Sequence, residues 1–237
     1  GVGKSRLSQA LHKRLVQSEC YAQGVIFVSL ATLQNAELIP AAIAEVMGVS
    51  LQGLRPPAEL LAEAIHQQNL LLILDNIEHL LPNVEVCQHL LANCPNLNIL
   101  VTSRLPVQIY GEWIYPLDGF SLPDTSQQFA ESAACQLFIQ TARRIKHDFA
   151  LTETDQSVVL KICRVLGGMP LGIEIAARWV QHLSCEEILE EMKHYLLSMQ
   201  HQHGHEGDDS SLGIVLQQSW EMLTTREQDI MQTLALF

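Results

Sequence analysis

The sequence predicts an α/β fold in which a parallel sheet with flanking helices is followed by an all-helical module. In the first half of the chain, short apolar runs rich in leucine, isoleucine and valine alternate with segments whose apolar residues recur at helical spacing. This alternation is the pattern of βαβ units, in which the strands run parallel and the helices cover the sheet. From Ala130 onward the strand-like runs stop and only helical spacing remains.

The apolar runs at residues 24–30, 70–75 and 98–102 are expected to form strands. The run at 70–75 has five apolar residues in succession before Asp75, which indicates a central parallel strand buried on both faces. Helices around these strands are expected over residues 4–16, 35–47, 59–67 and 84–92.

The second half is expected to be helical throughout. In one of its segments, Leu171, Ile175 and Trp179 recur every fourth residue and so share one face of a helix. Pro170 stands in the first turn of that helix, where proline is accepted. The expected helices cover residues 133–144, 154–165, 170–182, 185–199, 211–220 and 224–236.

Composition excludes several classes of function. The chain of 237 residues has a formal net charge of −12 and only 14 lysines and arginines, so a basic face for nucleic acid is not expected. Its six cysteines are scattered without a C-x-x-C pair, which favours reduced thiols over a disulfide or metal framework. No signal peptide and no bilayer-spanning apolar run is visible. We therefore expect a cytoplasmic protein that contacts neither nucleic acid nor a membrane through this segment.

The first residues match the second half of a phosphate-binding loop, G-x-x-x-x-G-K-[ST], the Walker A motif. In this motif, backbone N–H groups surround the α- and β-phosphates, the lysine reaches the β- and γ-phosphates, and the hydroxyl binds Mg²⁺. The helix that follows directs its partial positive charge at the same anion. The residues expected to bind phosphate are Gly1, Val2, Gly3, Lys4, Ser5 and Arg6.

The pattern lacks its leading glycine, so we expect the chain to begin inside the motif and to be a segment of a longer protein. The alternative for these residues is an ordinary helix N-terminus preceded by flexible glycines.

Asp75 and Arg104 follow the second and third expected strands. Ligands of open parallel sheets bind beyond the carboxyl ends of the strands, so both side chains are expected beside the phosphates. An aspartate after an apolar strand is the usual partner of Mg²⁺ in this arrangement, which predicts a magnesium site formed by Ser5 and Asp75. The alternatives are an aspartate that caps the next turn and an arginine in a solvated loop.

Residues 200–211 are polar and contain alternating histidines at 201, 203 and 205. Alternate histidines would bind Zn²⁺ if the segment were extended, whereas a solvated linker needs no ligand. We favour the linker, because no cysteine or orienting partner accompanies the histidines.

Taken together, the chain resembles the nucleotide-binding domain of the STAND class of P-loop NTPases, the NB-ARC-like ATPases, and among them the bacterial multidomain transcriptional regulators. The resemblance covers essentially the whole chain. It rests on Gly-Val-Gly-Lys-Ser-Arg-Leu at 1–7, Leu-Asp-Asn-Ile-Glu-His-Leu at 74–80, Val-Thr-Ser-Arg at 101–104, Gly-Gly-Met-Pro-Leu at 167–171 and the closing segments 219–223 and 234–237, which are similar to the start of a winged-helix module.

The resemblance implies three domains and a molecular switch. Residues 1–122 would be the P-loop nucleotide-binding domain without its first strand, 123–208 a helical lid and linker, and 209–237 the start of the winged helix. ADP would hold the protein closed, and exchange for ATP on a signal at a distant sensor domain would open it for self-association. Arg104 would sense the γ-phosphate, and Pro170 would contact the nucleotide from the lid. The implied ligands are ATP or ADP, Mg²⁺ and an unidentified sensor ligand.

Two departures from the family pattern affect activity. The residue after Asp75 is Asn76, where many P-loop ATPases have a carboxylate that polarises the attacking water. We therefore expect weak ATP hydrolysis, with Asp75 and Glu78 as the catalytic residues and Glu78 as the base. The absent first strand would lie in the middle of the sheet, so the chain as it stands is expected to bind nucleotide poorly.

Three alternative functions make demands on the sequence that can be compared with the residues present. An active AAA+-type ATPase or a kinase would need a carboxylate at position 76 and an arginine finger, and neither is evident. A LuxR-type DNA-binding module, suggested by residues 223–227, would need a basic recognition helix after them. A degenerate scaffold without nucleotide is disfavoured by the intact Lys4, Ser5, Asp75 and Arg104.

Overall fold

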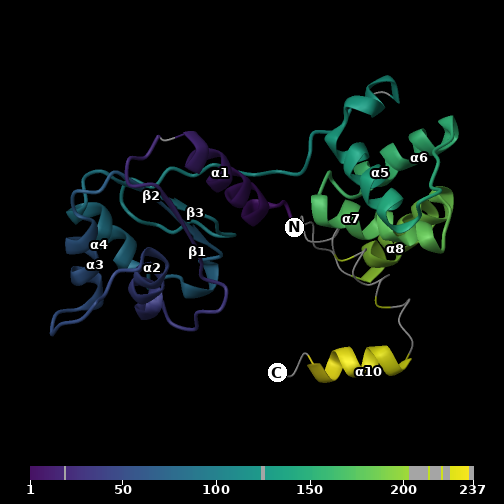
Figure 1. The fold of residues 1–237 in the computed structure, drawn as a ribbon. Helices are drawn as coiled ribbons and strands as arrows, with labels where there is room; N and C mark the ends of the chain where they lie inside the picture. The colour runs from purple at the N-terminus through teal and green to yellow at the C-terminus, as the bar shows by residue number, and fades with distance from the viewer. Residues whose placement is uncertain (19, 124–125, 203–212, 214–219, 221–224, 235–237) are drawn as a thin grey trace. The chain divides into compact units, whose positions relative to one another are not determined.

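The computed structural model describes residues 1–18, 20–123, 126–202, 213, 220 and 225–234 (Figure 1). The chain divides into two compact units. The sheet unit comprises Gly3–Pro116, and the helical unit comprises Gly1–Val2 together with Leu117–Phe237.

The sheet unit is built on three described strands, β1 Val25–Ser29, β2 Leu70–Asp75 and β3 Leu97–Val101. They run parallel in the order β1-β2-β3. The register pairs Ser29 with Asp75 and Leu74 with Val101, so the strands end together at one edge. The parallel sheet expected from the sequence, with the run at 70–75 as its central described strand, is confirmed.

Both faces of this sheet are covered, because side chains along each strand point alternately to either side. On one face, Leu70, Leu72 and Leu74 belong to a core with residues of the helices that connect the strands. On the other face, Leu71 and Ile73 pack with partly buried residues that include Leu15 of the first helix. The helical segments of the sheet unit are α1 Lys4–Ser18, η1 Ala36–Leu38, α2 Ile39–Met47, α3 Pro57–Ile65, η2 Glu78–Leu80 and α4 Glu85–Asn93.

Strand β3 forms one edge of the sheet among the described residues. The side chains of Ile99, Leu100 and Val101 are only partly buried there. The segment after β3 exposes large apolar side chains, with Trp113 97% and Tyr115 83% accessible. The expectation that a further strand lies in the middle of this sheet stays a prediction.

The helical unit encloses a separate core. The largest fully buried side chain of the unit, Phe138 of α5, packs with Ile162 of α6, Ile173 of α7 and Ile188 of α8 in one cluster. The expected all-helical module after the sheet is therefore confirmed. Its elements are η3 Ser126–Glu131, α5 Ala133–Ile145, α6 Glu153–Val165, α7 Pro170–Arg178, η4 Trp179–Gln181, α8 Cys185–Gln202 and α10 Thr225–Leu234.

Of the three large residues predicted to share one face, Trp179 is buried and Ile175 packs against the core, and only Leu171 departs from the row. Leu171 is 40% exposed, whereas Ile173, Ala176 and Ala177 are fully buried. Ile173 and the two short side chains of Ala176 and Ala177 therefore face the core, where α7 packs against α5.

Two sequence expectations fall largely on residues outside the description. His203, His205 and most of residues 209–224 are not described, so the zinc alternative, the linker and the start of a winged helix stay predictions. Helix α10 does fall within the helix expected at 224–236. In the part of the chain that the structure describes, no helix is long and apolar enough to cross a membrane.

Within the helical unit, the connector that follows Pro116 is bound to the turn before α7. The backbone N–H of Phe120 donates to the carbonyl oxygen of Gly168 at 2.8 Å. A Cβ atom at Gly168 would lie 2.2 Å from the oxygen of Phe120, and one at Gly119 would lie 2.3 Å from the oxygen of Gly167. Glycine is therefore needed on both sides of this contact, which we call the connector contact.

Replacing Gly168 by alanine should destabilise the helical unit more than replacing its neighbour Gly167. Both glycines have positive φ, 68° and 57°, so each change has a left-handed backbone cost of about 1–2 kcal/mol. Only at Gly168 does the added Cβ meet backbone atoms, which should add about 1–3 kcal/mol. Urea denaturation of the two variants measures the difference, and equal stabilities would contradict the connector contact.

Candidate functional site

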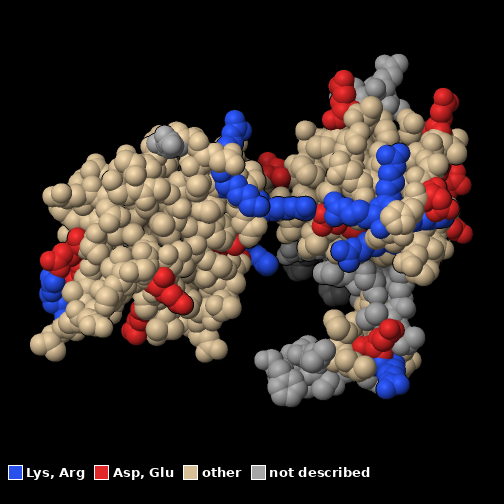
Figure 2. Space-filling model, viewed as in Figure 1, with Lys and Arg blue, Asp and Glu red and all other residues tan. Residues whose placement is uncertain are grey.

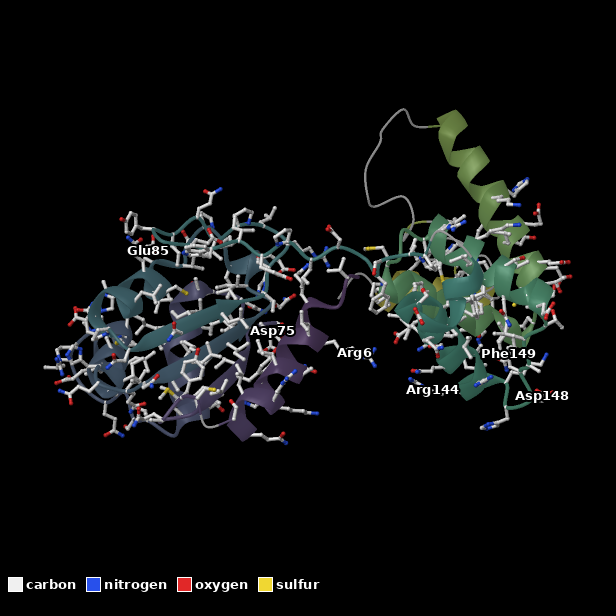
Figure 3. All side chains as sticks on the ribbon, turned by 90° about the horizontal axis from the view of Figure 1, so that it is seen from above. Arg6, Asp75, Glu85, Arg144, Asp148 and Phe149 are labelled. Carbon is white, nitrogen blue, oxygen red and sulfur yellow. The ribbon has the colours of Figure 1, made fainter. Side chains whose placement is uncertain are left out.

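The candidate site lies in the sheet unit, where the carboxyl ends of the strands meet the start of α1. Asp75 is the last residue of β2 and is only 6% exposed (Figure 3). Its Oδ1 accepts a hydrogen bond of 2.6 Å from the Thr102 hydroxyl, which follows β3. The Ser8 hydroxyl of α1 lies 3.5 Å from the same oxygen. The structure therefore brings together α1, β2 and the end of β3 around one buried carboxylate.

Thr102 also fixes the chain that leaves β2. Its hydroxyl accepts the backbone N–H of Asn76 at 2.9 Å while donating to Asp75. Its carbonyl oxygen accepts the N–H of Ile77 at 3.2 Å, and its own N–H donates to the oxygen of Leu74 at 3.0 Å. These bonds hold residues 74–77 against the end of β3 and set where Glu78 begins η2.

Asn76 adopts a left-handed conformation with φ of 67°, which asparagine tolerates better than most residues. Its side-chain amide lies 3.4 Å from Nδ1 of His79, whose Nε2 lies 2.9 Å from the carbonyl oxygen of Leu33. Because a carbonyl can only accept, Nε2 carries the hydrogen and Nδ1 can accept from the amide. The Asp-Asn-x-Glu-His string is thereby tied to the loop after β1.

Glu78 and Arg104, both predicted site residues, form an ion pair. Nε of Arg104 lies 3.3 Å from Oε1 of Glu78. The glutamate side chain is 19% exposed and the arginine side chain 81% exposed, so the carboxylate is the fixed partner. Glu78 follows Asp75 by three residues, and Arg104 follows Thr102 by two. The ion pair is therefore adjacent in sequence to the hydrogen-bonded cluster at the ends of β2 and β3.

Gly3 introduces α1 with a φ of 94°, a conformation that favours glycine, and its carbonyl accepts the N–H of Leu7 at 2.9 Å. Lys4 is the first residue of α1, and Ser5 and Arg6 are exposed in its first turn. Ser8, in the next turn, lies 2.9 Å from the carbonyl oxygen of Ser5, which links the motif to Asp75.

Charge is concentrated on this helix. Helix α1 carries Lys4, Arg6, Lys13 and Arg14 but no acidic residue, although the whole chain has a net charge of −12. Blue side chains gather along it on the face shown in Figure 2. Cations in the first turn oppose the helix dipole, whose N-terminal end is already positive. A bound anion would relieve this repulsion.

The remaining predicted residues belong to the helical unit. Gly1 accepts the backbone N–H of Leu171 at 3.3 Å, and the pair lies beside Pro170, the first residue of α7. Val2 is grouped with the same unit. The assignments of Gly1 and Val2 to phosphate binding and of Pro170 to nucleotide contact stay predictions.

The donor set fits Mg²⁺, which prefers hard oxygen ligands and usually keeps several waters and substrate oxygens. Ser5 offers a hydroxyl, and Asp75 offers Oδ2, since the short hydrogen bond from Thr102 ends at Oδ1. Among the described residues, no group of three or more His, Cys, Asp or Glu residues could form a dedicated metal cage.

Sequence reasoning gave no role to Thr102 or Ser8. The threonine closes an apolar run, where a β-branched residue is expected for its strand propensity alone. Ser8 lies three residues after Ser5, on the same side of α1. This spacing is the sequence signal that places Ser8 near the phosphate-binding motif.

No protein-family model matches the chain. It is similar to a Mycobacterium tuberculosis protein named "Putative HTH-type transcriptional regulator", at 33% identity over 189 residues, which are 79% of this chain and 20% of that protein. An uncharacterized protein of the same organism is 33% identical over 190 residues, 80% of this chain and 46% of its own length. The chain thus spans less than half of either relative.

Two solved structures of the ORC2 protein of Aeropyrum pernix also resemble the chain, one with ADPNP and ADP and one in the ADP form. Their TM-scores are 0.44 and 0.42, both at 14% sequence identity. The matches cover 96% and 94% of this chain and 61% and 62% of the ORC2 chains.

Replacing Thr102 by valine should lower the free energy of unfolding by about 1–3 kcal/mol. Valine keeps the shape but leaves Asp75 without its short hydrogen bond and the N–H of Asn76 without an acceptor. Thr102→Ser keeps the hydroxyl and is the matched control. In urea denaturation, the serine variant should have nearly the same free energy of unfolding as the parent. A valine variant as stable as the parent would contradict the role given to Thr102.

Proposed function

We propose that the chain is the P-loop nucleotide-binding core of a larger regulatory protein, in which ADP or ATP with Mg²⁺ acts as the switch. The observation that carries this proposal is the buried Asp75 carboxylate, joined to the start of α1 through Ser8 and to the end of β3 through Thr102. In this proposal the start of α1 binds phosphate, Asp75 holds magnesium and Arg104 senses phosphate, all at one edge of a parallel sheet.

In this proposal the phosphates bind at the start of α1. Gly3 allows the backbone to approach them, Lys4 bridges to the β- and γ-phosphates, and Arg6 adds a cation in the same turn. The positive charge of Lys4 in the first turn of α1 supports this assignment, because a cation there opposes the helix dipole and a bound anion would offset it.

The Mg²⁺ ion would be held by the Ser5 hydroxyl and, directly or through water, by Asp75. When bound, it neutralises phosphate charge and orients the terminal phosphate. Thr102 is a positioning residue in this scheme: its hydrogen bond to Oδ1 leaves Oδ2 of Asp75 to face the ion.

The finer proposal is a STAND-type switch of the NB-ARC kind. Arg104 would sense the γ-phosphate, and Pro170 would contact the nucleotide from the lid formed by the helical unit. ADP and ATP would then favour different arrangements of the two units, and exchange would shift the population toward an open, self-associating form.

The names of the relatives support a regulatory role, since one of them is that of an HTH-type transcriptional regulator. The matched segment is 20% of that protein, so its remaining parts are available for sensing and DNA binding. We propose that a signal at another part of the natural protein drives nucleotide exchange here, and that this segment itself does not touch DNA. The winged-helix module is part of the same proposal.

Hydrolysis should be slow, because Asn76 cannot accept a proton from the attacking water. Asn76→Asp should increase the rate of phosphate release, since aspartate also tolerates the left-handed conformation at this position. Single-turnover release of phosphate from ATP measures the change, with ADP affinity as the control. An unchanged rate at unchanged ADP affinity would show that this position does not limit hydrolysis.

The decisive experiment is to express the natural protein, including whatever its gene encodes before Gly1, and to release its bound nucleotide by denaturation. Chromatography should show nearly one ADP per protein. Lys4→Ala should come out empty, because a lost charge-assisted hydrogen bond of about 1.5–3 kcal/mol lowers affinity roughly ten- to hundred-fold.

Lys13→Ala is the matched control, since Lys13 lies exposed further along the same helix, and it should retain ADP. A well-folded protein that carries no nucleotide and binds none when ADP is added would support the scaffold alternative and refute the proposal.

A further inference from the structure

We propose that Glu78 is a specificity-determining residue that biases the site toward ADP over ATP by holding the guanidinium of Arg104. This inference rests on the proposed function, and it adds a residue that sets the relative affinity for the two nucleotides. The observation is the ion pair between Nε of Arg104 and Oε1 of Glu78 at 3.3 Å.

The position of Glu78 is set by the backbone. The N–H groups of Asn76 and Ile77 donate to the hydroxyl and carbonyl oxygens of Thr102, so the chain just before Glu78 is fixed to the chain just before Arg104. The glutamate side chain is only 19% exposed. A carboxylate fixed in this way presents a constant acceptor to any cation that follows β3.

Arg104 is the partner that can move. Its side chain is 81% exposed, and a long exposed side chain can adopt several rotamers at small cost. A guanidinium binds carboxylate and phosphate through the same donors, so Glu78 and a γ-phosphate compete for it. ADP has no γ-phosphate and leaves the pair intact. ATP can use Arg104 only at the expense of its bond to Glu78.

The size of the bias follows from the exposure of the pair. Exposed ion pairs contribute modestly, so removing the carboxylate should raise ATP affinity by about two- to five-fold, with ADP affinity unchanged. A general base would instead change the rate of hydrolysis and not the relative affinity for the two nucleotides. The role as a general base and the role proposed here therefore make different predictions for one substitution.

The test measures dissociation constants for ADP and for ADPNP in the natural full-length protein. Glu78→Gln should strengthen ADPNP binding two- to five-fold and leave ADP binding unchanged. Arg104→Ala should weaken ADPNP binding. In the Arg104→Ala background, Glu78→Gln should have no further effect on the ratio, because the competing guanidinium is gone.

The matched control is Glu85→Gln, an exposed carboxylate in the first turn of α4 labelled in Figure 3, which should change neither constant. An unchanged ratio of the ADPNP and ADP dissociation constants in Glu78→Gln would overturn the inference. So would an effect of Glu78→Gln that is equally large in the Arg104→Ala background, because that result indicates direct repulsion between Glu78 and phosphate. If the parent binds ADP normally in either case, the proposed function stands. A parent that binds neither nucleotide refutes both.

Discussion

The hydrogen bond between the hydroxyl of Thr102 and the buried carboxylate of Asp75 is the interaction on which the site depends. A carboxylate buried at the end of a central strand is costly unless its oxygens are satisfied. Thr102 satisfies one oxygen and, with the same hydroxyl, fixes the N–H of Asn76. Together with the bonds of the Thr102 backbone, this contact between neighbouring strand ends fixes the chain that leads to Glu78.

The charge distribution in the sheet unit differs from the acidic composition of the whole chain. An acidic chain places a helix without acidic residues, α1, beside the buried Asp75. Neither feature favours stability by itself, because Lys4 and Arg6 oppose the helix dipole and Asp75 loses hydration. In the proposed function each would become favourable, because phosphate and a divalent cation would bind between them. Features that cost stability in isolation are expected where a protein is adapted to a ligand.

Much of the fold could be predicted from the sequence, because the signals were local. The apolar run ending at Asp75 and the helical spacing after Ala130 are patterns within single segments. The buried face of α7 was predicted only in part, because the spacing of its large residues gives no sign that Ala176 and Ala177 are buried as well. Thr102 and the pairing of Glu78 with Arg104 could not be predicted, because they join residues that only the strand register brings together. The assignments of individual site residues still rest on chemistry and resemblance.

The connector contact has a mechanical consequence. Because Gly119 and Phe120 are held to the turn at Gly167 and Gly168 by backbone atoms, this part of the connector is fixed to the start of α7. The connector here belongs to the folded helical unit, and it can open only together with that turn.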